Sequence, residues 1–172
     1  MVFLVVVLII FFLARLFIRG GLMGGFPPPS FEGRLEAGEM DYDWTLRSLD
    51  GQKLDLAATR GKVIFLNMWA TWCPPCRAEM PSIQRLYDRM KDEGVVFILV
   101  SDESPERVRR FVEKERLTLP VYTSVGQIPA VLQTPGIPAT FIVSPQGKIA
   151  FKHMGAARWD DPRCVEFLRG LM

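Results

Sequence analysis

The sequence predicts an α/β fold in which a mixed central sheet carries helices on both faces. Residues 62–69 and 95–100 are largely apolar runs of strand length, the pattern of strands that are buried on both faces. Each run is followed by a segment with helical periodicity, at residues 74–91 and 105–116. A strand followed by a helix therefore occurs twice, which is typical of this class.

The elements before the first buried strand are predicted to form a hairpin. Residues 42–47 and 52–54 are short extended segments separated by Asp50-Gly51, a pair that favours a tight turn. We expect this hairpin to cover a sheet edge.

The two predicted helices have clear starts. Pro74 opens the first, and Ser104-Pro105 supplies a cap and a first-turn proline for the second. In the first helix Glu79 lies off the apolar stripe, together with other charged residues. That stripe consists of Met80, Ile83, Leu86, Tyr87 and Met90.

The C-terminal part of the chain is predicted to complete the sheet. A hairpin closes it, with a turn at Ser144-Pro145-Gln146-Gly147, and Asp160-Asp161-Pro162 begins a last helix. The remaining predictions are an extended piece at 120–123, a helical turn at 128–133 and strands at 140–143 and 148–153.

The composition limits the possible functions. The chain has 172 residues, 49% of them hydrophobic, and a formal net charge of +2, which fits one folded domain and gives no basic stripe for nucleic acid. It has three cysteines and one histidine, His153, too few ligands for a usual structural zinc site. We expect no nucleic acid, no metal and no bound cofactor; two of the cysteines, Cys73 and Cys76, are two residues apart and can form a redox-active disulfide.

The N-terminus has the composition of a membrane anchor. Residues 2–14 carry no charged or polar side chain, and the apolar run resumes after Arg15. We predict an anchor or uncleaved signal at 1–19, a Gly/Pro-rich linker at 20–39 and a folded domain at 40–172. A cleaved signal peptide is the alternative, although no clear small-x-small site follows the run.

Two features of the sequence disagree about the side of the membrane on which the domain lies. Arg15 and Arg19 follow the apolar run, and positive residues normally stay cytoplasmic. A tethered dithiol domain, however, makes most sense on the oxidising side. We therefore expect a single N-terminal anchor in the cytoplasmic membrane with the domain on the periplasmic or extracytoplasmic side.

Cys73 and Cys76 form the motif that carries the chemistry. Cys73 lies between a buried strand and a helix, where the helix N-terminus favours a thiolate, so it is the predicted nucleophile. Cys76, one turn on, is the predicted resolving thiol. Pro74 and Pro75 have no N–H, which leaves the Cys76 amide as the near donor; we expect the Cys73 pKa to fall from about 8.5 to about 7.

Residues 67–81, NMWATWCPPCRAEMP, closely resemble the TlpA/ResA-like branch of the thioredoxin superfamily. The hairpin with Asp50-Gly51, an insertion at about 102–134 and the stretch Gly136-Ile137-Pro138-Ala139-Thr140-Phe141 extend the resemblance. It implies a thioredoxin-like fold and a membrane-tethered thiol-disulfide oxidoreductase. Such a protein reduces disulfides of extracytoplasmic partners, often apocytochrome c, with electrons from a membrane donor. We expect a monomer.

The resemblance also implies roles for individual residues. Pro138 would be a cis-proline beside the disulfide, leaving the Ile137 backbone to pair with an extended substrate. The Glu79 carboxylate would raise the thiol pKa values and take a proton from Cys76. Asn67 stands where thioredoxin has a buried aspartate, which shifts the proton handling to Glu79. The predicted substrate-binding residues are Trp72, Pro74, Pro75, Ile137 and Pro138, and the predicted catalytic residues are Cys73, Cys76 and Glu79.

Two other functions remain as alternatives. A peroxiredoxin-like peroxidase would share the fold, but it would place a lone cysteine after a Thr-x-x pattern. A copper metallochaperone would want a Cys-x-x-x-Cys spacing and a further histidine ligand. Cys164 is expected to be a buried, inert thiol and His153 a structural residue.

Overall fold

The computed structural model describes residues 26–31 and 38–172. Its single sheet has seven strands in the order β2-β1-β5-β4-β3-β6-β7. The strands β3, β4 and β5 are parallel to one another, and the remaining neighbours are antiparallel. The strands are β1 (Thr45–Ser48), β2 (Lys53–Leu54), β3 (Val63–Met68), β4 (Val95–Ser101), β5 (Val121–Val125), β6 (Ala139–Val143) and β7 (Ile149–Met154).

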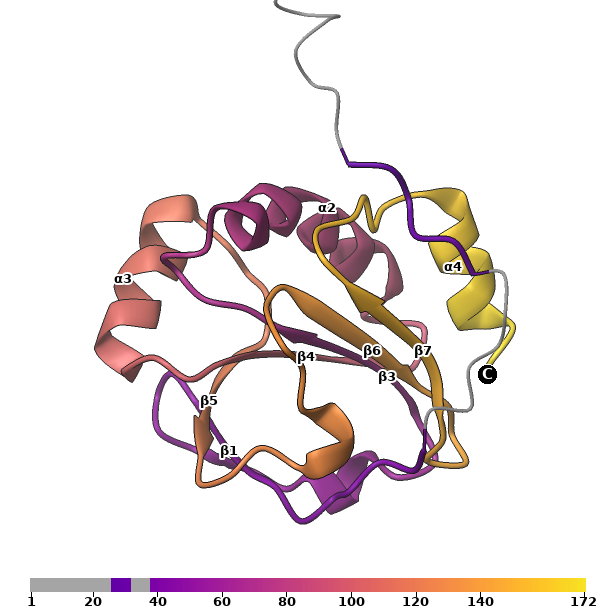
Figure 1. Ribbon diagram of the computed structural model, residues 1–172, viewed down its shortest axis with the longest axis horizontal. Helices are drawn as coiled ribbons and strands as arrows, with labels where there is room; N and C mark the ends of the chain where they lie inside the picture. The colour runs from indigo at the N-terminus through magenta and orange to yellow at the C-terminus, as the bar shows by residue number, and fades with distance from the viewer. Residues whose placement is uncertain (1–25, 32–37) are drawn as a thin grey trace, which may run out of the picture.

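The α-helices lie on one face of this sheet (Figure 1). Side chains of α2 (Pro74–Met90), α3 (Pro105–Glu115) and α4 (Pro162–Arg169) all join the same apolar cluster. The strands β3, β4 and β5 step across the sheet in one direction, so right-handed crossovers place α2 and α3 on the same side.

The other face is covered by shorter elements. The 3₁₀ helices η1 (Leu56–Thr59) and η2 (Ala130–Leu132) contribute Leu56 and Leu132 to a second apolar cluster, together with residues of the segment 40–44. The predicted helices on both faces are thus α-helices on one face and single 3₁₀ turns on the other.

The predicted N-terminal hairpin is present. Strands β1 and β2 pair antiparallel around a turn in which Gly51 has a φ of 90°, a conformation that glycine adopts without strain. Strand β1 also pairs with β5, so the hairpin extends the sheet by two strands and β2 forms its edge.

Strand β3 positions the predicted site. All six of its residues are buried, and it lies between parallel β4 and antiparallel β6. Its last residue is Met68, and the Trp69 amide still donates to the Val100 carbonyl. The chain then turns within four residues into Cys73 and α2, so the cysteines lie at the carboxyl edge of the parallel strands.

Part of the predicted linker packs on the domain. Pro29 is buried, Phe31 is half-buried against the core, and Glu39 forms a β-bridge with Lys148. The predicted anchor at 1–19 lies outside the described residues. Within 26–31 and 38–172, no helix has the length and apolar character needed to cross a membrane.

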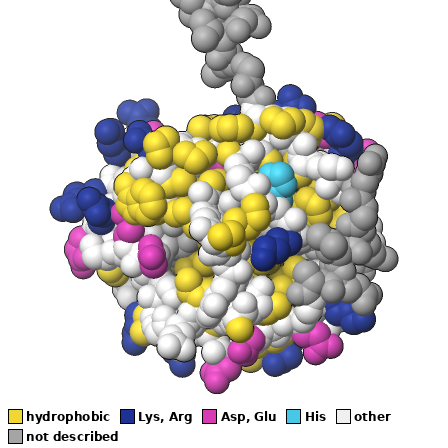
Figure 2. All heavy atoms as spheres, viewed as in Figure 1, with side chains coloured by type: hydrophobic (Ala, Val, Ile, Leu, Met, Phe, Trp, Pro, Cys, Tyr) yellow, Lys and Arg dark blue, Asp and Glu magenta, His cyan; other side chains and the backbone are white. Residues whose placement is uncertain are grey.

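Charged side chains of both signs are spread around the rim of the face in Figure 2.

Candidate active site

Cys73 and Cys76 form a disulfide at the start of α2. Cys73 is the N-cap, prolines follow it, and the Cys76 amide lies 3.3 Å from the Cys73 sulfur. This is the arrangement predicted from the sequence, with one backbone donor near the sulfur. Cys73 is 3% exposed and Cys76 is fully buried, so Cys73 is the more accessible of the two.

The loop before Cys73 is held by Glu103, which follows β4. The Glu103 carboxylate accepts hydrogen bonds from the Thr71 amide at 2.5 Å and the Thr71 hydroxyl at 2.7 Å, and Ser101 Oγ lies 3.2 Å from it. The sequence pattern did not single out Glu103. Its position just after a buried parallel strand was the available signal, because the carboxyl ends of β3 and β4 meet at one edge.

The Ile137–Pro138 peptide bond is cis, which confirms that prediction. The Ile137 carbonyl oxygen lies 3.8 Å from the Cys73 sulfur, so the proline loop faces the disulfide. The Gly155 amide donates to the Pro138 carbonyl at 2.9 Å and ties this loop to the segment after β7.

Glu79 lies one helical turn after Cys76 and is 1% exposed. Three N–H donors contact its carboxylate: Asn67 Nδ2 at 2.9 Å from Oε1, and the Ala157 amide at 3.1 Å and Trp159 Nε1 at 2.9 Å from Oε2. Burial raises the pKa of Glu79 to about 7, and the donors from Trp159, Asn67 and Ala157 oppose that rise.

Glu79 is buried, although its position off the apolar stripe of the helix suggested that it would face solvent. The strand β3 supplies Asn67, and the segment after β7 supplies Ala157 and Trp159, so polar donors line the place where Glu79 enters the interior. Helical periodicity cannot show such donors, because they lie 12, 78 and 80 residues away in the sequence.

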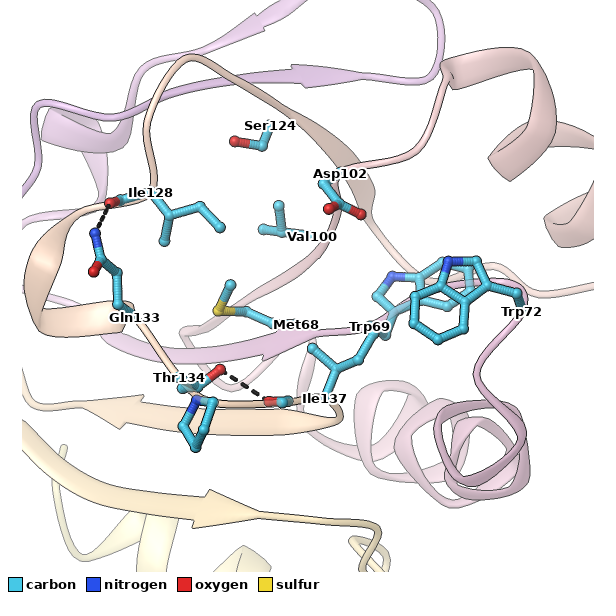
Figure 3. Close-up of a pocket in the computed structure, with 12 residues that line it drawn as sticks. Met68, Trp69, Trp72, Val100, Asp102, Ser124, Ile128, Gln133, Thr134 and Ile137 are labelled. Atoms are coloured by element: carbon cyan, nitrogen blue, oxygen red, sulfur yellow. Dashed lines mark hydrogen bonds between the residues drawn. The ribbon is translucent and has the colours of Figure 1, made fainter.

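An apolar pocket of about 380 Å³ is lined at one end by Trp72, which precedes Cys73, and by Ile137, whose carbonyl faces the Cys73 sulfur (Figure 3). Trp72 stands at one end of the pocket and is 64% exposed, whereas Trp69 is buried. Pro74 and Pro75 are exposed next to Trp72, as expected for residues that meet a substrate. The apolar lining comes mainly from Met68, Val100, Ile128, Pro135 and Ile137.

The other two candidate residues, Cys164 and His153, contact the segment that carries Ala157 and Trp159: the Cys164 sulfur lies 3.9 Å from the Arg158 carbonyl, and the His153 ring meets the Trp159 ring edge-on. Cys164 is buried in α4, and burial raises the pKa of its thiol to about 12. His153 is half-buried, and burial lowers its pKa. In the part of the chain that the structure describes, no group of three or more His, Cys, Asp or Glu residues could hold a metal ion.

Comparison with known proteins finds a matching family and similar chains. Residues 37–152 match the AhpC/TSA family. The chain is 37% identical over 123 residues to "Thiol-disulfide oxidoreductase ResA" of Halalkalibacterium halodurans, covering 69% of each chain. It is 33% identical over 124 residues to "Thioredoxin-like protein YneN" of Bacillus subtilis, covering 70% of this chain and 73% of the relative.

A solved structure shares the fold. A secreted Mycobacterium tuberculosis disulfide oxidoreductase, described as homologous to E. coli DsbE, superposes with a TM-score of 0.61 at 26% identity. The match covers 74% of this chain and 95% of that one.

The burial of Glu79 predicts a specific dependence of stability on pH. The ordinary pKa of a glutamate is 4.5 and that of Glu79 in the folded protein is about 7, so between these values the folded protein holds a proton that the unfolded chain has released. This group therefore lowers the free energy of unfolding as pH rises through that window, by about 3 kcal/mol in total. Below the window the penalty is absent.

Urea unfolding of the oxidised protein and of Glu79→Gln at about pH 4 and about pH 8 measures this effect. The difference in unfolding free energy between the two proteins should change by about 3 kcal/mol across the window, in favour of the variant at high pH. A difference that stays constant with pH would contradict the prediction.

Proposed function

Because the chain belongs to the AhpC/TSA family and, within it, to the ResA-like thiol-disulfide oxidoreductases, we propose that it reduces disulfides of extracytoplasmic protein partners. The observation that carries this proposal is the Cys73–Cys76 disulfide at a helix start, facing the cis Pro138 loop. Apocytochrome c is the partner that the family resemblance suggests.

The reaction is an exchange of disulfides in two steps. The Cys73 thiolate attacks one sulfur of the substrate disulfide, forms a mixed disulfide and releases a substrate thiolate. The Cys76 thiolate then attacks the Cys73 sulfur, breaks the mixed disulfide and releases the second substrate thiolate. The protein is left with the Cys73–Cys76 disulfide, which a dithiol donor in the membrane reduces to start the next cycle.

The helix start supports the reducing direction. Pro74 and Pro75 leave the Cys76 amide as the donor near the Cys73 sulfur, so the thiolate receives moderate stabilisation. A disulfide is a strong oxidant when its reduced form is strongly stabilised. A moderately stabilised thiolate therefore favours a dithiol that gives electrons away.

Glu79 is the group that takes the proton from Cys76. Residues three apart on a helix are neighbours, with about 5–6 Å between their Cβ atoms, and both side chains are buried away from solvent bases. The pKa of Glu79, raised by burial to about 7, is close to the operating pH, where a general base is most effective. The three N–H donors hold the carboxylate in its charged form once the proton has left.

The apolar pocket supports an extended, partly apolar substrate segment. Trp72, which precedes Cys73 in the chain, and Ile137, whose carbonyl oxygen lies 3.8 Å from the Cys73 sulfur, both line the pocket (Figure 3). An apolar side chain next to the substrate cysteine can therefore enter the pocket while the backbone meets Ile137. The pocket would select substrates by the shape of the side chain next to the substrate cysteine. The cysteine pair by itself does not distinguish between substrates.

The proposed location of the domain is the extracytoplasmic side of the cytoplasmic membrane. The apolar run within residues 1–19 supports a single anchor, and a dithiol protein that reduces partners needs a donor within reach of that membrane. The domain would act there as a monomer on its tether.

Replacing one cysteine at a time tests the assigned roles. With Cys76→Ser, partner proteins should accumulate as mixed disulfides on Cys73, because the resolving thiol is absent. With Cys73→Ser, turnover of a protein disulfide should fall to background. Non-reducing electrophoresis and a coupled reduction assay measure these outcomes, and Cys164→Ser is the matched control that should keep full activity.

The same assays separate the alternatives. Consumption of hydrogen peroxide with no reduction of protein disulfides would favour the peroxidase. Stoichiometric bound copper with no turnover would favour the metallochaperone.

The role of Glu79 predicts a slower second step in Glu79→Gln. At neutral pH the release of 5-thio-2-nitrobenzoate from a mixed disulfide on Cys73 should slow by about 100-fold, since no base accepts the Cys76 proton. In the unchanged protein this rate should rise with pH through about 7, as Glu79 loses its proton. Stopped-flow absorbance measures both, and Glu113→Gln, an exposed change on α3, is the control. Equal rates in the two variants would refute the role.

The side of the membrane on which the domain lies and the direction of the redox reaction can be tested together in cells. A maleimide that does not cross membranes should label Cys73 in intact cells, because the domain is outside and its cysteines are mostly reduced. The Cys73→Ser variant gives the background. Labelling that requires lysis would place the domain inside, and labelling that requires prior reduction would indicate an oxidant.

A further inference from the structure

Residues 26–31, here called the strap, lie along the domain beside α4 (Figure 1). The Phe31 ring stacks on Phe167 of α4 with 4.4 Å between ring centroids, and it contacts Phe151 of β7 at 4.6 Å. The Pro27 carbonyl accepts a hydrogen bond from the Arg158 amide at 3.2 Å. Pro29, between these contacts, is buried. The strap thus joins a strand, a helix and the segment between them.

That segment, residues 155–161, supplies two of the three donors to Glu79. The Ala157 amide and the Trp159 indole both contact Oε2, and Arg158, which binds the strap, lies between them in the sequence. At its start, Gly155 contacts the carbonyl of Pro138. A displacement of this segment would therefore reach both the buried acid and the proline loop.

The segment is also tied directly to the sheet and to α2: the Trp159 ring meets the Phe65 ring of β3 edge-on, and Arg85 of α2 pairs with Asp160 at 2.7 Å. The Trp159 amide donates to Ser82 Oγ on α2 at 3.1 Å, and the Arg158 side chain pairs with Asp161 at 2.8 Å. The Asp161 pair is local to the segment and cannot press it onto Glu79. The strap contacts it from outside, with three proline residues in a row that limit its own flexibility.

We propose that the strap holds residues 155–161 closed over Glu79, and that Phe31 is a positioning residue for the thiol chemistry. This rests on the proposed role of Glu79 as the proton acceptor.

The direction of the effect follows from the causes that set the Glu79 pKa. Burial is the largest cause and raises it, and the hydrogen bonds are smaller and lower it. Opening the segment removes both, so the pKa falls back toward 4.5. Charged groups near this segment come from α2, β7, the segment itself and the start of α4. They are Arg85, His153, Arg158, Asp160, Asp161 and Arg163, with Arg85 paired to Asp160 and both Arg158 and Arg163 paired to Asp161.

The experiment uses the full chain, oxidised, with Phe31→Ala. The ¹H–¹⁵N signal of the Trp159 indole reports the protonation of Glu79 without any turnover. In the variant we expect its titration midpoint to fall by about one pH unit and exchange of the Ala157 amide to speed up by about tenfold. Phe31→Tyr, which keeps the stacked ring, should restore both values, and Ser30→Ala, an exposed change in the strap, should alter neither.

A second variant keeps the proposal testable in case Phe31→Ala does not fold. Pro27→Gly loosens the strap at an exposed position and should shift the midpoint in the same direction by a smaller amount. If folded variants at both positions keep the original midpoint and the original Ala157 exchange, the strap is not a positioning element. The Glu79 role fails separately, through an unchanged second-step rate in Glu79→Gln.

Discussion

The carboxylate of Glu79 joins three parts of the fold that are distant in sequence. Asn67 on β3 contacts one oxygen, and Ala157 and Trp159 contact the other. A buried donor without an acceptor costs about 1–3 kcal/mol, so the acid satisfies groups that would otherwise destabilise the interior. Burial in turn brings its pKa to about 7. The same contacts thus hold α2, β3 and the segment after β7 together and set the protonation of the acid on which the proposed proton transfer depends.

The cysteine pair depends on this framework for its placement. Parallel β3 and β4 end at one sheet edge, where Glu103 from one strand end holds Thr71 from the other. Cys73 then meets the start of α2 on one side and the Ile137 carbonyl on the other. The reactive sulfur is therefore positioned by a strand end, a helix start and a proline loop, each of them anchored in the sheet.

The parts of this arrangement that could be predicted from the sequence are those with local signals. The buried run at 62–69 and the helix opened by Pro74 come from apolar patterning and proline preference, and Asp50-Gly51 marks the hairpin. The cis bond before Pro138 came from the family resemblance. The burial of Glu79 could not be predicted in this way, because its position on the helix suggests solvent and its donors come from elsewhere in the chain.

The sequence by itself determined the class of fold, the redox pair and the order of the elements, since each depends on neighbouring residues. Tertiary structure decided which face of the sheet the α-helices cover, because the direction of strand crossing sets it. It also brought Glu103 to Thr71, and Phe31 to Phe167 across the domain. These contacts arise when chain segments far apart in sequence pack together, and such packing has no signature in the spacing of residues along the chain.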